Sequence, residues 1–109
     1  MNSHTLKWIM QRLTAILLIP LSFWFVYICI FFQKISYAEI IIFFSSYLNS
    51  FLFLTLIVSM LIHSKLGCET IIEDYVKSAF LKNIILLFIQ FIIYFSIFIS
   101  FISIFIILF

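Results

Sequence analysis

The sequence predicts an all-α integral membrane protein with three transmembrane helices and its N-terminus on the cytoplasmic or matrix side. Hydrophobic residues make up 67% of the 109 residues and charged residues only 9%, against roughly 25% charged residues in soluble domains. Three long runs carry no charged residue, and lysine and arginine gather on one side of the resulting topology. A soluble chain of this length leaves much of its surface in contact with water, so we expect the bilayer to be its solvent.

Each of the three runs is long enough to cross a membrane. A hydrocarbon core of about 30 Å needs roughly 20 apolar residues in a helix, and a backbone in lipid must satisfy its own hydrogen bonds, which favours helices. The runs are Leu13–Phe32, Ile40–Ile62 and Ile84–Phe109. We therefore expect one transmembrane domain, residues 1–109, with helices at about 13–33, 40–65 and 83–109. Gly67, the single glycine of the sequence, is expected to end the second helix.

The distribution of basic residues predicts the orientation. The N-terminal segment contains Lys7 and Arg12, and the first connection has only Lys34. The second connection holds three lysines: Lys65, Lys77 and Lys82. Because basic segments stay on the inner side of a membrane, the N-terminus and the second connection are expected to face the cytoplasm or the mitochondrial matrix. The membrane is then the bacterial cytoplasmic (inner) membrane or the mitochondrial inner membrane.

A polar stripe runs along the second predicted helix and ends at a histidine. At 100° per residue the following residues share one face: Ser45, Asn49, Ser59 and His63. Polar groups at membrane depth normally face the interior of a bundle, so this face is expected to be buried. Two interpretations of His63 are open. Its imidazole is either a metal ligand, in particular to haem iron, or an interfacial side chain in contact with headgroups.

The first predicted helix carries small residues in register with a tryptophan. Trp8, Ala15 and Ser22 are seven residues apart, and small side chains let a neighbouring helix approach closely. Pro20 is expected to kink the helix, which a packed neighbour can tolerate. Arg12 either extends toward the interface or pairs with an anionic group such as a haem propionate.

The second connection offers a carboxylate and a phenol side by side. Asp74 and Tyr75 at the membrane surface could supply a hydrogen-bond donor and a group that orients it or relays protons. Alternatively, Tyr75 belongs to the aromatic belt of the membrane interface. In the third predicted helix three serines share a face, where their hydroxyls can bond to carbonyls one turn back: Ser96, Ser100 and Ser103.

Taken in order, these motifs resemble the hydrophobic membrane anchors of succinate dehydrogenase (respiratory complex II), in particular the smaller of its two cytochrome b anchor chains. The resemblance rests on Trp8, on Gln11-Arg12-Leu13-Thr14-Ala15, on His63 followed by Gly67, and on Asp74-Tyr75-Val76. The length and the three-helix layout are similar too, so the resemblance covers essentially the whole chain.

The resemblance implies a role for four residues. The histidine at the position of His63 is an axial ligand of haem b, whose other ligand comes from the partner anchor subunit. The residues corresponding to Tyr75 and Asp74 bind ubiquinone, the tyrosine through a quinone carbonyl. Arg12 would support the haem propionates or the quinone site.

The resemblance also implies a multi-subunit enzyme. Its other chains are a cytochrome b556-type large anchor subunit, an iron–sulfur subunit and a flavoprotein subunit. This sequence contains no flavin or nucleotide fingerprint and no cysteine set for an iron–sulfur cluster. We therefore expect a non-catalytic anchor that serves the respiratory chain and the tricarboxylic acid cycle, without a nucleic-acid partner.

Two other functions are compatible with a small apolar chain. A small multidrug-type transporter needs a carboxylate inside the membrane to exchange protons for cationic drugs, and the three uncharged runs contain none. A purely structural assembly subunit would give no reason for the spacing of His63, Asp74 and Tyr75.

Overall fold

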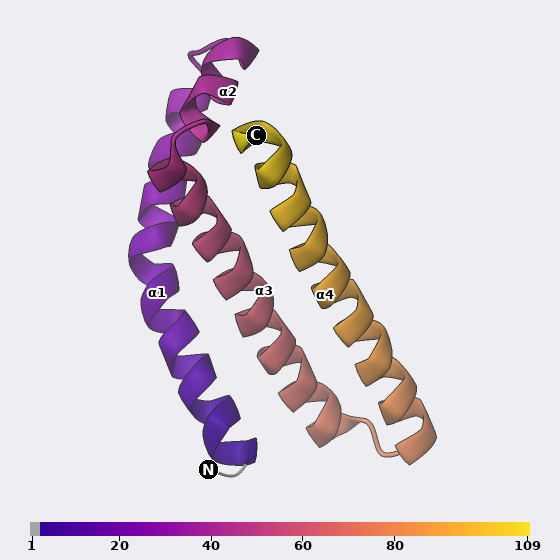
Figure 1. Ribbon diagram of the computed structural model, residues 1–109. Coiled ribbons are helices and arrows are strands. Elements are labelled where there is room, and N and C mark those ends of the chain that lie inside the picture. The colour runs from indigo at the N-terminus through magenta and orange to yellow at the C-terminus, as the bar shows by residue number, and fades with distance from the viewer. Residues whose placement is uncertain (1–2) are drawn as a thin grey trace.

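The computed structural model describes residues 3–109, and these residues form three long helices and one short helix (Figure 1). The helices are α1 (Ser3–Phe32), α2 (Tyr37–Phe44), α3 (Tyr47–Tyr75) and α4 (Ala79–Leu108). The three long helices are apolar and long enough to cross a membrane. The predicted all-α class with three transmembrane helices is therefore confirmed.

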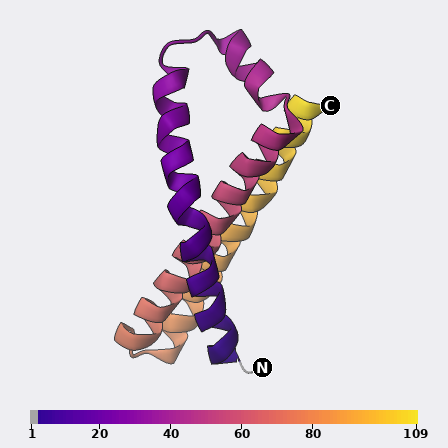
Figure 2. The same cartoon turned by 90° about the vertical axis from the view of Figure 1, so that its left-hand side faces the viewer.

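Helix α3 lies between α1 and α4. It runs side by side with α4 along its length, and α1 crosses it obliquely (Figures 1 and 2). The N-terminus and the short connection between α3 and α4 lie at one end of the structure, which we call the basic end. The C-terminus and α2 lie at the other end (Figure 1).

The second predicted helix is interrupted at its beginning by a corner. Ser46 has extended backbone geometry, and its hydroxyl accepts a hydrogen bond from the N–H of Asn49, so α3 begins here and α2 is separate. The side chain of Asn49 donates to the carbonyl of Phe43 at 3.1 Å, and the buried hydroxyl of Ser50 donates to the carbonyl of Phe44. These bonds satisfy carbonyls at the end of α2 that have no partner within their own helix.

The predicted polar stripe is therefore confirmed only in the half that lies nearer the basic end. Ser45 ends α2 and is exposed, and Asn49 caps the corner. Ser59 is buried and His63 half-buried within α3. A pattern of polar residues at helical spacing does not reveal the helix break between Ser45 and Ser46, because serine occurs both within helices and at their caps.

The prediction that Gly67 ends the second helix is wrong. Helix α3 continues through Gly67 to Tyr75, and the glycine does not adopt a positive φ angle. The last two turns are held against α1 by Glu69, which is buried although it is charged. The connection to α4 is correspondingly short. Val76 caps the end of α3, and the hydroxyl of Ser78 accepts a hydrogen bond from the N–H of Leu81 at the start of α4.

The buried face of α1 is not the one that its small residues predict. Thr14, Leu21 and Ile28 are buried at heptad spacing, whereas Trp8 and Ser22 are exposed. Branched side chains fill the contact with α3, because in lipid van der Waals packing drives helix association. The helix passes through Pro20 without a break, and its axis changes direction near its middle (Figure 1).

Aromatic side chains fill the gap where α1 and α3 diverge toward α2. The ring of Phe43 on α2 lies 6.3 Å from Trp24 and 5.1 Å from Phe32, both on α1. Phe44 lies 5.0 Å from Phe53 on α3. The Phe32–Phe43 and Phe44–Phe53 pairs are edge-to-face, an arrangement that adds stability beyond the area it buries, so the aromatic side chains of α2 pack against both long helices.

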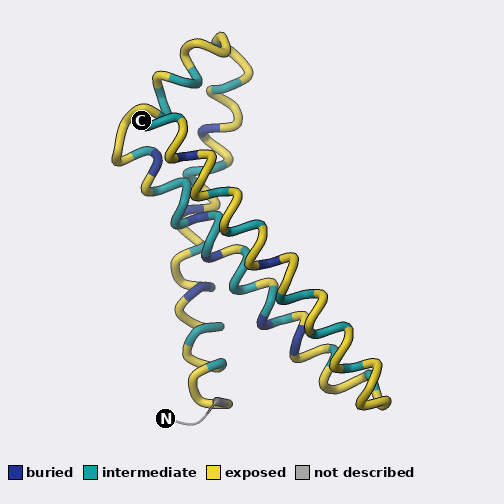
Figure 3. The backbone as a smooth tube through the Cα atoms, turned by 45° about the vertical axis from the view of Figure 1, so that its right-hand side comes forward, coloured by how far each residue is buried: buried dark blue, intermediate teal, exposed yellow. Residues whose placement is uncertain are grey.

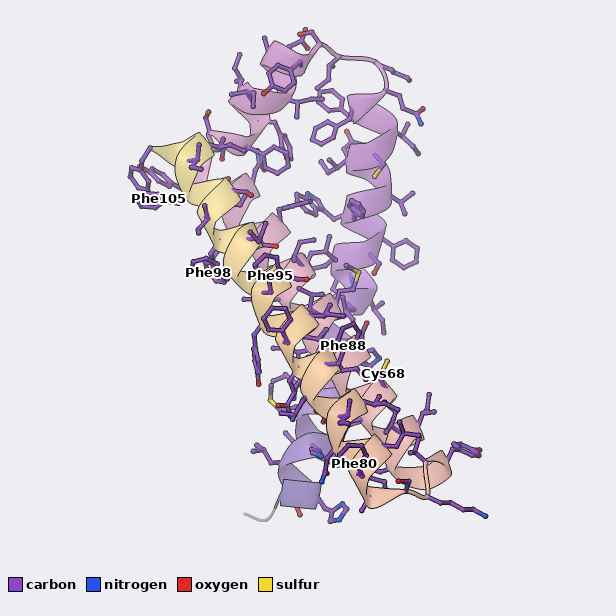
Figure 4. The ribbon with its side chains drawn as sticks, turned by 90° about the vertical axis from the view of Figure 1, so that its right-hand side faces the viewer. Cys68, Phe80, Phe88, Phe95, Phe98 and Phe105 are labelled. Atoms are coloured by element: carbon purple, nitrogen blue, oxygen red, sulfur yellow. The ribbon has the colours of Figure 1, made fainter. Side chains whose placement is uncertain are left out.

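The outer faces of the helices are apolar and exposed. Burial is confined to narrow lines where helices touch (Figure 3). Exposed phenylalanines are spread along α4, and Figure 4 labels five of them: Phe80, Phe88, Phe95, Phe98 and Phe105. Ser96 and Ser100 donate to carbonyls one turn back at 2.7 and 2.9 Å, as their sequence predicted. Such a surface requires lipid or other apolar helices as its surroundings.

The grouping of basic residues at one end predicts how the protein sits in the membrane. We expect the basic end to face the cytoplasm or matrix, and two matched cysteine variants test this. In a background with Cys29 and Cys68 replaced by serine, Lys77→Cys probes the basic end and Lys34→Cys the α2 end. The predicted ends hold five and one of the six basic residues. The excess of basic residues at the basic end is therefore kept in both variants. It is four against one in Lys77→Cys and five against none in Lys34→Cys.

An impermeant thiol reagent added from the inner side should label position 77 and leave position 34 unlabelled, and the reverse should hold from the outer side. Labelling of position 34 from the inner side alone would contradict the orientation.

Candidate functional site at the crossing of α1 and α3

His63 lies on α3 where α1 crosses it, and it is bonded to the first helix. Its Nδ1 atom lies 2.9 Å from the hydroxyl oxygen of Thr14. Thr14 is only 3% exposed. The same hydroxyl oxygen lies 2.8 Å from the carbonyl of Met10 and 3.1 Å from that of Gln11. The imidazole is therefore held on one side by a partly buried hydrogen bond between two helices.

The chemistry of His63 fits an axial haem ligand. A porphyrin supplies four nitrogen ligands, so a haem iron needs only one imidazole from a chain. His63 uses Nδ1 to contact Thr14, which leaves its other ring nitrogen as the one that could bind a metal. Within residues 3–109, no three histidine, cysteine, aspartate or glutamate side chains come together to hold a bare metal ion.

A network of charges follows His63 toward the basic end. Glu69 of α3 is 4% exposed, and it pairs with Lys65 at 3.0 Å and with Lys7 of α1 at 3.5 Å. Lys7 also pairs with Glu73 at 3.3 Å, and the ammonium group of Lys82 on α4 donates to the backbone carbonyl of Glu73 at 3.2 Å. This network, which we call the charge clamp, joins all three long helices one to three turns beyond His63.

A polar cavity of about 370 Å³ opens between α1 and the end of α3. It is lined by His4, Lys7, Trp8, Gln11, Leu66, Thr70, Glu73 and Asp74. The side-chain oxygen of Gln11 is buried and has no hydrogen-bond partner among the described residues. Asp74 thus shares the lining of this cavity with polar side chains of α1.

Tyr75 and Arg12 both lie on the surface. Tyr75 is 79% exposed at the last position of α3 and does not line the polar cavity. Successive residues of a helix point in different directions, which separates the phenol from the carboxylate of Asp74. The guanidinium carbon of Arg12 lies 5.4 Å from the centre of the exposed Trp8 ring, a cation–π distance.

The structure thus joins only some of the predicted site residues and adds others. It brings His63 to α1 and Asp74 to the polar cavity, while Arg12 and Tyr75 present their side chains outward. Thr14 belongs to a motif of the sequence, but the sequence alone assigns no role to Thr14 or to Glu69. The signal available for Thr14 is its heptad spacing with Leu21 and Ile28. Glu69 falls in a predicted connection, where a carboxylate has no reason to be buried.

The fold and this site define a multi-pass helical membrane protein that presents an imidazole at a helix crossing near its basic end. The chain belongs to the succinate dehydrogenase/fumarate reductase transmembrane subunit family, whose model matches residues 1–106.

Three curated relatives are similar to the chain, each described as a succinate dehydrogenase hydrophobic membrane anchor subunit. Those of Rickettsia prowazekii (strain Madrid E) and Rickettsia bellii (strain RML369-C) are 32% identical over 90 residues, which is 82% of this chain and 70% of each relative. That of Rickettsia typhi (strain ATCC VR-144 / Wilmington) is 32% identical over 84 residues, or 76% of this chain and 66% of the relative. Family membership confirms the predicted resemblance and favours it over a transporter.

The charge clamp leads to a prediction about stability. Glu69→Gln keeps the size of the side chain but leaves Lys65, whose side chain is only 16% exposed, without its carboxylate. We expect this change to lower the free energy of unfolding by about 1–3 kcal/mol, because the amide oxygen can still accept a hydrogen bond but the largely buried ammonium group of Lys65 loses its opposite charge. Thermal unfolding of the purified protein in detergent measures the effect.

Glu39→Gln is the matched control, since Glu39 is exposed at the α2 end. It should stay within about 0.5 kcal/mol of the unmodified protein. Equal midpoints of thermal unfolding for Glu69→Gln and Glu39→Gln would show that the charge clamp contributes nothing to stability.

Proposed function

We propose that this chain is the membrane-anchor subunit of a succinate dehydrogenase and that it holds haem b and contributes to ubiquinone binding. The observation that carries the proposal is His63, a half-buried imidazole fixed by a hydrogen bond with α1 close to the basic end. Family membership and the names of the Rickettsia relatives support the anchor role.

His63 would hold haem b through its imidazole, and the partner anchor subunit would supply the other ligand of the iron. Haem iron supplies one-electron chemistry when it is bound. The part of this chain is to hold the imidazole in place: Thr14 fixes one ring nitrogen, and the charge clamp keeps α1 and α3 together nearby. The partner is a cytochrome b556-type large anchor subunit, whose apolar helices would cover part of the exposed faces described above.

Tyr75 and Asp74 contribute to the quinone site from the end of α3. Reduction of ubiquinone takes two electrons and two protons, and an exposed phenol at the membrane surface is accessible to a quinone carbonyl and to water. Asp74 lines a polar cavity from which protons can be exchanged. Arg12, held over Trp8 on the outer face of α1, supports anionic groups of the haem or the quinone site.

Succinate oxidation itself belongs to the other subunits. A flavoprotein subunit and an iron–sulfur subunit bind on the basic end, and this chain keeps them at the membrane. The membrane is the bacterial cytoplasmic membrane or the mitochondrial inner membrane. The basic end offers exposed Lys77 and Asp74 to these water-soluble partners.

The haem assignment predicts the result of removing the imidazole. His63→Leu should abolish or strongly alter the haem b absorption spectrum of the assembled, purified complex, because leucine cannot bind iron. His4→Leu removes the other histidine of the chain, which is exposed, and should leave the spectrum intact. An unchanged spectrum and midpoint potential in the His63→Leu complex would end the assignment.

The quinone assignment predicts a selective loss. Tyr75→Phe removes one hydroxyl and should lower the rate of ubiquinone reduction about tenfold. This loss is smaller than the roughly 10²–10³-fold loss in rate that is typical when a hydrogen-bond donor is removed from a water-excluded site. Dye reduction upstream of the quinone and the haem spectrum should be preserved.

Tyr37→Phe is the matched control, because Tyr37 is equally exposed (78% against 79%) but lies at the α2 end. It should not affect either rate. If Tyr75→Phe and Tyr37→Phe gave the same ubiquinone rate as the unmodified complex, Tyr75 would have no role in the quinone site.

A further inference from the structure

The hydroxyl of Thr14 has more neighbours than hydrogens to share with them. Its oxygen lies 2.8 Å from the carbonyl of Met10, 3.1 Å from the carbonyl of Gln11 and 2.9 Å from Nδ1 of His63. A hydroxyl has one hydrogen and two acceptor lone pairs, and a carbonyl can only accept. Either the imidazole or a carbonyl must therefore receive the hydrogen of Thr14.

Donation to the imidazole leaves an unfavourable arrangement. The hydroxyl oxygen would then face two carbonyl oxygens at hydrogen-bond distance with no hydrogen between them, in a residue that is 3% exposed. Donation to the backbone, with the hydrogen shared between the Met10 and Gln11 carbonyls, removes this conflict, provided that Nδ1 of His63 carries a hydrogen and donates it to Thr14. Both the hydroxyl and the ring nitrogen then have a partner of the opposite kind, as buried polar groups require.

Other hydroxyls of the same chain favour the second arrangement. Five more side chains among the described residues donate to the carbonyl one turn back at 2.7–2.9 Å: Ser45, Thr55, Thr70, Ser96 and Ser100. This bond is the usual choice of serine and threonine inside a helix, and the 2.8 Å distance from Thr14 to Met10 falls in the same range.

We infer that Thr14 is a positioning residue, which holds His63 as the tautomer protonated on Nδ1 and so leaves the lone pair on Nε2 for haem iron. The inference rests on the proposed function. A hydrogen bond at the outer nitrogen of a metal-binding histidine fixes its tautomer and orientation and raises its basicity. A more basic imidazole stabilises ferric iron, so the bond to Thr14 lowers the midpoint potential of the haem.

Two substitutions at Thr14 test the inference in the assembled complex. Thr14→Val retains the branched shape but cannot accept the bond from Nδ1, whereas Thr14→Ser retains the hydroxyl. In the valine complex we expect the haem midpoint potential to shift to a more positive value and the electron paramagnetic resonance signal of the ferric haem to change. The serine complex should return both toward the unmodified values.

The outcomes separate the inference from the proposed function. If His63→Leu removes the haem but the valine and unmodified complexes share one potential and one resonance signal, the inference fails while haem ligation stands. Equal shifts in the valine and serine complexes also overturn it, because they indicate packing alone. A His63→Leu complex with an unchanged haem would overturn the proposed ligation itself.

If the valine complex does not assemble, Thr14→Ala replaces it. Loss of haem or a positive shift in the alanine complex, with retention in the serine complex, supports the inference. Equal haem content and equal potential in the alanine and serine complexes contradict it.

Discussion

The crossing of α1 over α3 is the contact on which the rest of the structure depends. It brings the buried residues of α1 against α3, it places Thr14 beside His63, and it ends in the charge clamp around Glu69. The hydrophobic effect gives apolar surface no preference for another helix over lipid, so hydrogen bonds and ion pairs, together with van der Waals packing, specify which faces meet. In this chain those polar contacts lie in the half of the crossing nearest the basic end, and aromatic rings complete the other half.

Polar residues therefore have two separate uses in this fold. At the corner between α2 and α3, Asn49 and Ser50 satisfy carbonyls of the backbone. Near the basic end, Thr14 and Glu69 join side chains of different helices. The first use builds the fold, and the second positions the histidine. Both bury polar atoms only where a partner is present, as a medium without water requires.

Much of the architecture could be predicted from composition and charge, because lipid permits few solutions. The absence of charge over long runs indicated three membrane helices, and the polar face of the second run located His63 at a helix contact. What failed depended on tertiary partners. Gly67 was expected to end a helix, but Glu69 and its lysines hold the next two turns in place. The partner of His63 could not be foreseen, since Thr14 is 49 positions away in the sequence.

The uninterrupted course of α3 has a mechanical consequence. Tyr75 follows His63 by twelve positions, and a helix rises 1.5 Å per residue, so the two positions are about 18 Å apart along one axis. No flexible segment lies between them, because the helix passes through Gly67 without a break. The helix therefore keeps a fixed distance between the two positions. A tilt or slide of α3 moves both residues together, and their spacing is insensitive to motions of the short connection that follows.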